Sequence, residues 1–282
     1  MIKKVIHCAD IHLPRYQRLE EFSEYLTTFI EDVKRECKGF DPSEVRILIA
    51  GDLVHSKNEI SNELMSFAAT MIRSLESIAP VIVISGNHDY VANNVSRKDT
   101  LTSLFETAAF QNSHYLDMEL GYVSGCVYDD GITWAVYSIY EGYVRPDIES
   151  AKREHPENAV VGLYHGVIVG AMLNNGMTMD SGVSGDVFDG CDVVMAGDIH
   201  KGQTVENARN IPIVYAGSLI QQNFGESYKG HGYVVWTFPD IIDSVGGIQH
   251  EFRTITGRYG LYDITINDIS DFDEDKEVFN NK

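Results

Sequence analysis

The chain has 282 residues, of which 44% are hydrophobic, enough for one large α/β domain or for one domain with a small appendage. Its formal net charge of −20 excludes a nucleic-acid binder that relies on an electropositive surface alone, because such affinity comes from Lys and Arg that replace counterions. No apolar run approaches the ~20 residues that span a bilayer, so we expect no membrane partner. The four cysteines form no Cys-x-x-Cys pair, which favours reduced thiols in the cytoplasm, or in the host cytoplasm for a viral protein.

Short β-branched apolar runs predict buried strands along most of the chain. We expect them at residues 4–9, 45–50, 81–85, 131–137, 159–164, 192–196, 211–215 and 232–238. Amphipathic helices separate the first three strands, because apolar side chains share one helical face over residues 22–33 and again over 60–78. This order is typical of βαβ units and a largely parallel sheet, and the chain becomes richer in strands after about residue 120.

Side chains able to bind a metal follow five of these strands, directly after each apolar run. The five loops are Asp10-Ile11-His12, Gly51-Asp52-Leu53-Val54-His55, Gly86-Asn87-His88-Asp89, His165-Gly166 and Gly197-Asp198-Ile199-His200. Ligands of open α/β sheets collect at the carboxyl ends of the strands, so we expect these loops to converge. Carboxylate, imidazole and amide ligands without a thiolate favour Mn²⁺ or Fe²⁺. We therefore predict a two-metal site bridged by one carboxylate, with two Mn²⁺ as the expected ions and Mg²⁺ or Fe²⁺ as alternatives.

Each of these motifs also has a purely structural interpretation. An Asp-x-His triplet is common by chance, and a Gly-Asn-His-Asp turn can be stabilised by its own side chains. His165 by itself would more often be an ordinary polar residue at the end of a strand. Five such loops in this order, each directly after an apolar run, favour the metal site over the structural interpretation.

The ordered set of loops resembles that of the calcineurin-like metallophosphoesterases, and within that superfamily it is most similar to the SbcD-type DNA-repair nucleases. Three segments carry the closer resemblance: residues 51–55, which end in histidine; Phe-Asp-Gly-Cys-Asp at 188–192; and Tyr-Ala-Gly-Ser-Leu at 215–219, followed by Asn-Phe-Gly-Glu at 223–226. The resemblance covers roughly residues 1–240. It implies a four-layered α/β/β/α sandwich of two mixed sheets flanked by helices.

The resemblance also implies a role for each matched residue. The first metal would be held by Asp10, His12 and His200, and the second by Asn87, His165 and Asp198, with Asp52 bridging both. His88 would face the scissile phosphate, His55 would support it nearby, and Asp89 would orient His88. Water would attack phosphorus in line while both cations absorb the developing charge.

Asp198 departs from the family pattern, which normally has a histidine at this position. A carboxylate oxygen binds Mn²⁺ and Mg²⁺ well, so we interpret Asp198 as a working variant that still completes the second metal site. The alternative is that Asp198 turns away from the site and the second metal binds weakly.

We expect a metallophosphoesterase nuclease domain over residues 1–250, and the start of a truncated or minimal capping region with an acidic tail over 251–282. The resemblance implies DNA as the substrate and an SMC-like coiled-coil ATPase subunit as the partner. It also implies a homodimer formed through helices near residues 60–78 and 98–109, although the apolar faces of these helices would alternatively only cover the sheet.

The leading functional hypothesis is a Mn²⁺-dependent DNA exonuclease and single-strand endonuclease that serves DNA repair and recombination. One alternative is a calcineurin-like phosphatase or phosphodiesterase that acts on a small phosphorylated molecule. Another is a weakly catalytic scaffold subunit, which Asp198 and the acidic composition favour. His88 argues against the scaffold, because a scaffold has no evident need for this histidine.

Overall fold

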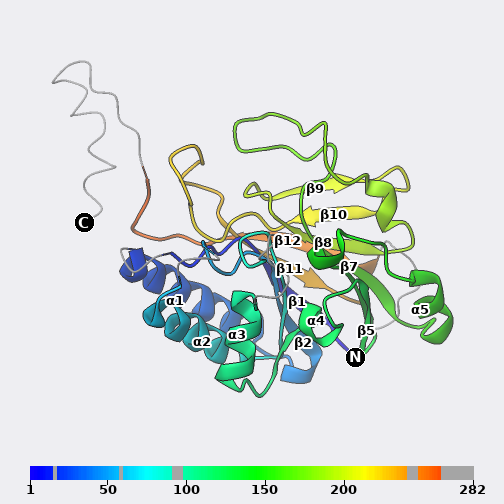
Figure 1. Ribbon diagram of the computed structural model, residues 1–282, viewed down its shortest axis with the longest axis horizontal. Coiled ribbons are helices and arrows are strands. Elements are labelled where there is room, and N and C mark those ends of the chain that lie inside the picture. The colour runs from blue at the N-terminus through cyan, green and yellow to red at the C-terminus, as the bar shows by residue number, and fades with distance from the viewer. Residues whose placement is uncertain (15–17, 57–59, 91–97, 240–246, 262–282) are drawn as a thin grey trace.

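The computed structural model describes residues 1–14, 18–56, 60–90, 98–239 and 247–261, and its ribbon shows sheets stacked between helices (Figure 1). The strands are β1 (Lys4–Cys8), β2 (Val45–Ala50), β3 (Val81–Ile84), β4 (Ser113–Tyr115), β5 (Gly125–Asp129), β6 (Ile132–Tyr137), β7 (Ala159–His165), β8 (Val193–Gly197), β9 (Gln203–Glu206), β10 (Pro212–Tyr215), β11 (Gly232–Thr237) and β12 (Gln249–Thr254). The helices are α1 (Leu19–Glu36), α2 (Asn62–Glu76), α3 (Thr100–Ala108), α4 (Leu116–Glu119) and α5 (Ile148–Glu154), with 3₁₀ turns η2 (Pro42–Glu44), η3 (Ile139–Glu141) and η4 (Gly185–Phe188). Among the described helices, none combines the length and the apolar character needed to cross a bilayer.

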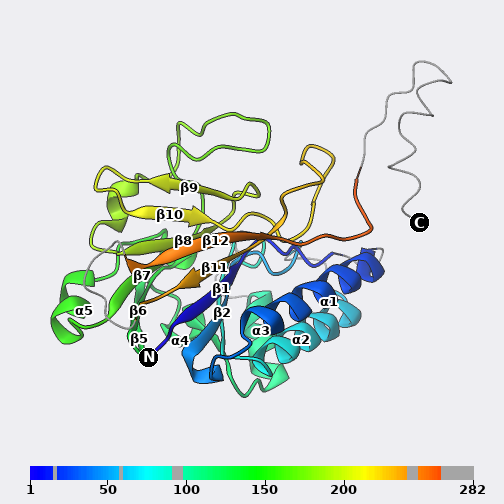
Figure 2. The ribbon, with the colours of Figure 1, turned by 180° about the vertical axis from the view of Figure 1, so that it is seen from behind.

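The strands form two mixed sheets (Figure 2). The first sheet has the order β12-β11-β1-β2-β3-β4. Strands β1 to β4 run parallel, β11 is antiparallel to β1, and β12 is antiparallel to β11. The second has the order β5-β6-β7-β8-β10-β9, in which the four inner strands run parallel between two antiparallel edge strands. Each sheet therefore has a parallel centre whose carboxyl ends present loops at one edge.

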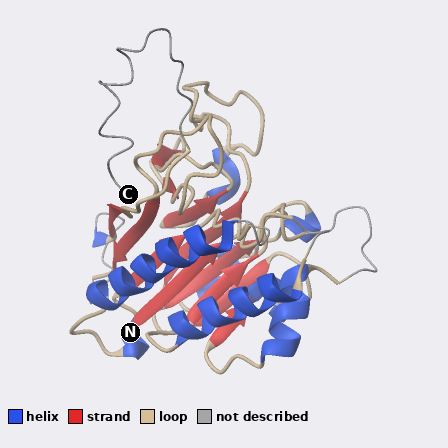
Figure 3. Ribbon diagram, turned by 90° about the vertical axis from the view of Figure 1, so that its left-hand side faces the viewer, coloured by secondary structure: helices blue, strands red, loops and turns tan. Residues whose placement is uncertain are grey.

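The central strands β1, β2 and β3 of the first sheet are buried on both faces, which explains why they read as largely apolar runs. Ile6 and Ile49 pack beneath α1 and α2, whereas the alternate side chains Val5 and Leu48 pack against the second sheet. Figure 3 shows α1 and α2 lying side by side across the strands. The other face of the second sheet packs against side chains of α5 and η4, so the molecule has the four layers α/β/β/α.

Local signals in the sequence fix the two longest helices and α3. The hydroxyl of Ser61 caps α2 by accepting from the backbone N–H of Leu64, and the carboxylate of Asp99 caps α3 through Thr102. On α1, the buried side chains include Phe22 and Phe29, which lie seven residues apart on one face. Full burial of a side chain of this size contributes about 1.5–3 kcal/mol.

The predicted fold class of two mixed sheets flanked by helices is confirmed. All eight predicted strands form, and each bound agrees within one residue. The strands β4, β5, β9 and β12 were not predicted, because they are short or half-exposed and carry polar residues among the apolar ones.

The segment predicted to start a cap begins inside β12, which forms the edge of the first sheet next to β11. Beyond β12 the chain packs next to the loop after β10, where the backbone N–H of Leu261 donates to the side chain of Gln221 at 2.7 Å. Residues 262–282, which include the acidic tail, lie outside the described residues. The division into a domain over 1–250 and a capping region over 251–282 stays a prediction.

Candidate metal centre

The five polar loops meet where the carboxyl ends of the two sheets come together. The first two loops are joined by backbone hydrogen bonds from His12 to Asp52 (2.9 Å) and from Leu13 to Leu53 (2.8 Å). The backbone N–H of His88 brings in the third loop by donating to Asp52 Oδ1 at 2.8 Å. The loops after β7 and β8 join through His165 and Asp198, whose contacts are described below.

The backbone at this edge adopts conformations that L-residues rarely use. Asp10, His12, Asp52 and Asp198 have φ angles of 51°, 48°, 54° and 93°. A non-glycine residue with positive φ stores strain that the surrounding structure must overcome, and such residues gather at functional sites. Gly86 is needed for a different reason, because a Cβ at this position would overlap the Asp52 carboxylate.

One cluster of possible ligand atoms is formed by Asp10, His12 and His200, whose ligand atoms all lie within 4.8 Å of one another. The Nε2 atoms of His12 and His200 are 3.1 Å apart, and His200 Nε2 is 3.9 Å from Asp10 Oδ1. Asp10 is fully buried and His12 is 3% exposed, so neither side chain is available to bulk water. The structure thus brings together the three residues predicted for the first metal.

A second cluster consists of Asp10, Asp52 and His165. Asp52 Oδ2 lies 3.4 Å from His165 Nε2 and 3.5 Å from His12 Nε2, so this one oxygen faces both clusters. That is the position which a bridging carboxylate must occupy. Asn87, predicted as a ligand of the second metal, lies in the adjacent loop 86–89 with an exposed side chain.

The imidazole orientations test whether a cation fits between these groups. His165 Nδ1 donates to the backbone carbonyl of Ala50 at 2.7 Å, which leaves Nε2 unprotonated in the neutral ring. This buried Nε2 has no hydrogen-bond partner, although it lies near the carboxylate of Asp52. A lone pair that faces a carboxylate is repulsive unless a proton or a metal cation lies between them, so the residues fit a bound metal.

Charge in the centre leads to the same conclusion. The pKa of Asp10 is raised to about 7, mainly by burial; His165 and His200 oppose this rise, and the nearby carboxylates of Asp52 and Asp198 add to it. Burial acts to lower the pKa of His165, but the Asp52 carboxylate raises it well above its ordinary value. A cluster that must otherwise hold protons is suited to divalent cations, which neutralise its carboxylates.

Asp198 lies beside the second cluster. Its Oδ1 atom is 3.8 Å from His165 Nε2, and its backbone N–H donates to both carboxylate oxygens of Asp10 at 3.1 Å. Asp198 is not a member of the tight ligand clusters found among the described residues. The carboxylate therefore faces the second site from a greater distance than Asp52 does.

His88 and His55 lie next to the first cluster. The ring centroid of His88 is 4.7 Å from that of His12 and 5.7 Å from that of His55, and the three rings form a further group of possible ligands. The half-buried ring of His88 is oriented by a 2.6 Å hydrogen bond between Nδ1 and the carbonyl of His55. This arrangement leaves Nε2 of His88 available for a proton transfer at the metal centre.

The expectation that Asp89 orients His88 is corrected by these contacts. The buried carboxylate of Asp89 instead accepts from the backbone N–H groups of Gly86 (2.9 Å), Val54 (3.2 Å) and Leu53 (3.3 Å). Asp89 thus joins the second and third loops to each other, because a carboxylate in a turn satisfies backbone donors that would otherwise be buried without a partner.

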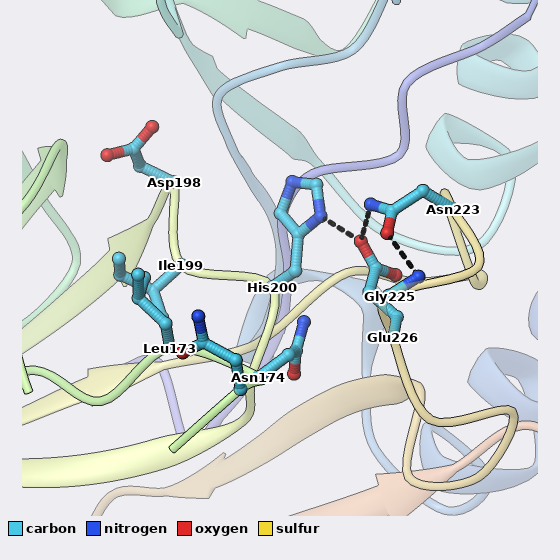
Figure 4. A pocket seen from close by; sticks show the side chains of 9 residues that line it. Leu173, Asn174, Asp198, Ile199, His200, Asn223, Gly225 and Glu226 are labelled. Atoms are coloured by element: carbon cyan, nitrogen blue, oxygen red, sulfur yellow. Dashed lines mark hydrogen bonds and ion pairs between the residues drawn. The ribbon is translucent and has the colours of Figure 1, made fainter. Parts of the chain in front are cut away.

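Glu226 was not predicted as a site residue, although it ends the Asn-Phe-Gly-Glu segment. Its Oε1 atom accepts from His200 Nδ1 at 2.7 Å and from Asn223 Nδ2 at 2.7 Å (Figure 4). Burial lowers the pKa of His200, but this hydrogen bond carries it above the ordinary value. A carboxylate on the remote nitrogen of a metal-binding imidazole fixes its tautomer and makes the metal-facing nitrogen more basic.

The substitution Glu226→Gln is expected to weaken Mn²⁺ binding about 10–100-fold, because the amide no longer polarises the His200 ring. Calorimetric titration with Mn²⁺ measures this directly. Glu119→Gln is the matched control, since Glu119 pairs in the same way with His114 at 2.9 Å on the surface. Equal Mn²⁺ affinities of the Glu226 variant and the unmodified protein would refute the assigned role.

A cavity of about 370 Å³ opens beside His200 and Asp198. Its walls come from residues 173–175, 198–200, 223, 225 and 226 (Figure 4). The volume is within the usual range for sites that hold small ligands, roughly 300–1,000 Å³. A substrate in this cavity would have its phosphate next to the two ligand clusters.

Two stacked mixed sheets, with carboxylates and imidazoles gathered at their carboxyl ends, define a metal-dependent hydrolase of the α/β/β/α class. The chain belongs to the calcineurin-like phosphoesterase family, whose model matches residues 3–202. All ten predicted site residues lie within that stretch. Membership of this family implies that the chain is a phosphoester hydrolase with a centre for two metals.

The chain is 34% identical over 263 residues to an uncharacterized protein of Acanthamoeba polyphaga mimivirus. The matched stretch is 90% of this chain but only 19% of the viral protein. Among solved structures, a dimetal phosphatase from Danio rerio superposes with a TM-score of 0.53 at 12% identity, covering 85% of this chain and 93% of that chain. A 5′-nucleotidase precursor from Thermus thermophilus gives a TM-score of 0.41 at 13% identity, covering 90% and 54%. At 12% identity the likeness to the Danio rerio phosphatase is one of fold.

Proposed function

We propose that this chain is a Mn²⁺-dependent phosphodiester hydrolase that cleaves DNA, as an exonuclease and as an endonuclease on single strands. The observation that carries the proposal is the pair of ligand clusters that share Asp10, with Asp52 Oδ2 facing His12 and His165. Two metals held there would polarise the phosphate, lower the pKa of a water molecule and neutralise the charge that develops at phosphorus.

The chain's own residues then have distinct tasks. The proposed ligands of the first metal are Asp10, His12 and His200, and those of the second are Asn87, His165 and Asp198, with Asp52 between them. Glu226 holds the His200 ring, and the carbonyl of His55 holds the His88 ring. His88 would protonate the leaving oxygen as the P–O bond breaks.

The resemblance of two segments to the SbcD-type nucleases supports DNA over a small phosphorylated substrate. The segments 215–219 and 223–226 resemble signatures of the SbcD-type nucleases, and Glu226 of the second segment contacts a proposed metal ligand. The net charge of −20 opposes tight binding of DNA by the chain alone. We therefore also propose an SMC-like coiled-coil ATPase as a partner that contributes DNA affinity, and a homodimer that uses the outer faces of α2 and α3.

Cleavage of end-labelled linear and circular single-stranded DNA, with Mn²⁺, Mg²⁺ or a chelator, tests the proposal. We expect cleavage of both substrates with Mn²⁺ and none with the chelator. Intact DNA together with rapid hydrolysis of 4-nitrophenyl phosphate would instead support a phosphatase of small molecules. Intact DNA and intact aryl phosphates with bound Mn²⁺ would support the weakly catalytic scaffold.

Asp198 is expected to hold the second ion, because its Oδ1 atom lies 3.8 Å from His165 Nε2. Asp198→Ala should weaken the binding of the second Mn²⁺ at least about tenfold, a loss of roughly 1.4 kcal/mol, and Asp198→His should restore it. The number of bound ions is measured by Mn²⁺ titration, with the exposed Asp180→Ala as the control. Unchanged binding of two ions by Asp198→Ala would mean that Asp198 is not a ligand.

A further inference from the structure

Two loops form opposite walls of the cavity beside the metal centre. One wall consists of residues 173–175, from the loop after β7, and the other includes Asn223, Gly225 and Glu226, from the loop after β10. Both loops project from the same end of the molecule, as Figures 1 and 2 show from opposite sides. A substrate in this cavity whose phosphate reaches His200 would therefore lie next to these loops.

The loop after β10 has a fixed shape. The carboxamide of Asn223 donates to Glu226 Oε1 at 2.7 Å and accepts from the backbone N–H of Gly225 at 2.8 Å. The other carboxylate oxygen of Glu226 accepts from the backbone N–H of Gln222 at 2.9 Å. Because Glu226 also holds His200, this network sets the position of residue 224 relative to the metal centre.

Phe224 lies in the turn whose other residues form this network, and it is 64% exposed. Phe224 itself is not among the residues that line the cavity, but its two neighbours in the chain, Asn223 and Gly225, both are, so Phe224 lies at the edge of the cavity. Exposing a phenylalanine on a rigid turn is unfavourable in water, and exposed apolar side chains that gather at one place mark interaction sites. Of the eleven exposed large hydrophobic side chains that the structure describes, five belong to the two loops: Val169, Met172, Met177, Phe224 and Tyr228.

The opposite wall offers hydrogen-bonding groups on an equally defined loop. The backbone N–H of Leu173 donates to the carbonyl of Met177 at 2.8 Å, and Asn175 Oδ1 accepts from the backbone N–H of Met177 at 3.0 Å. Asn174 sits at the tip of this hairpin with an exposed carboxamide, which has both donor and acceptor atoms. The cavity thus has an exposed aromatic residue, Phe224, next to one wall and a neutral polar side chain, Asn174, on the other.

We propose that Phe224 and Asn174 form a nucleobase subsite, in which Phe224 stacks on the base attached to the phosphate held at the metal centre and Asn174 contacts the edge of that base. The inference rests on the proposed function and specifies its substrate as a nucleotide unit rather than any phosphodiester. Stacking suits this chain because it needs no positive charge, and a net charge of −20 weakens recognition through phosphates.

The subsite is tested by calorimetric titration of the Mn²⁺-loaded protein with deoxyadenosine 5′-monophosphate and with 2-deoxyribose 5-phosphate, which lacks the base. The unmodified protein should bind the nucleotide about tenfold more tightly, within the range measured for single base–aromatic stacks. Phe224→Ala should reduce this preference to less than twofold, whereas Phe224→Trp should retain it. Tyr228→Ala is the matched control, because Tyr228 is exposed on the same loop but, unlike Phe224, has no neighbour in the chain that lines the cavity.

Equal affinities for the two ligands in the unmodified protein would overturn the subsite, as would a nucleotide preference that survives Phe224→Ala. The test does not depend on cleavage. A protein that prefers the nucleotide but leaves DNA intact would contradict the nuclease proposal while supporting the subsite. Cleavage of DNA without any preference for the nucleotide would support the nuclease and contradict the subsite.

Discussion

Replacing Asp52 by asparagine is expected to lower the turnover of bis(4-nitrophenyl) phosphate at least about a thousandfold. Asp52 Oδ2 faces both ligand clusters, and its Oδ1 accepts from the backbone of His88. An amide keeps the shape of the side chain but loses the negative charge that a bridge between two cations requires. Two-metal stabilisation of a phosphoryl transition state amounts to several kcal/mol, and each 1.36 kcal/mol is a factor of ten in rate.

The control for this substitution is Asp180→Asn, which removes one carboxylate from an exposed position that belongs to none of the ligand clusters. Thermal unfolding followed by circular dichroism checks that both variants are folded. An Asp52→Asn variant that is folded and keeps more than about a tenth of the turnover would contradict a bridging role, because tenfold is only about 1.4 kcal/mol.

Replacing His88 by alanine should lower the rate of DNA cleavage about 10²–10⁴-fold and leave the Mn²⁺ affinity within twofold of the unmodified protein. The reason is that we assign this ring to proton transfer and not to metal binding. The loss should depend on the leaving group. DNA cleavage expels an alkoxide that needs a proton, whereas 4-nitrophenolate leaves readily without one. The variant should therefore lose far more activity on DNA than on bis(4-nitrophenyl) phosphate.

His114→Ala is the control for His88, since His114 lies on the surface with 52% of its side chain exposed. If His88→Ala lowers Mn²⁺ affinity as strongly as it lowers turnover, the ring acts as a ligand in the group formed by His12, His55 and His88. If both substrates lose activity equally, His88 stabilises the phosphate and does not act as the acid.

Much of the fold was predictable because its central strands are buried on both faces. A run such as residues 45–50 is apolar apart from Arg46, and the structure shows it between the helices and the second sheet. The edge strands β9 and β12 gave no such signal, since exposed and half-buried residues lie side by side in them. Their pairing depends on neighbours that are distant in sequence, such as β11 for β12.

The site was predictable where a ligand directly follows a strand. Parallel strands end at a common edge, so Asp10, Asp52 and His165 could be expected to meet without knowledge of distances. Glu226 could not be placed in this way, because it reaches His200 through a turn 26 residues further along the chain. The role of Asp89 was also misassigned, because a carboxylate next to a histidine can serve the ring or the backbone equally well.

The most direct test of the metal centre is anomalous diffraction at the manganese edge from crystals grown with Mn²⁺. We expect two peaks about 3.5–4 Å apart on either side of the Asp52 carboxylate. One should lie within bonding distance of Asp10, His12 and His200, and the other next to His165 and Asp198. A single peak, or two peaks that Asp52 does not join, would contradict a two-metal centre built on this carboxylate.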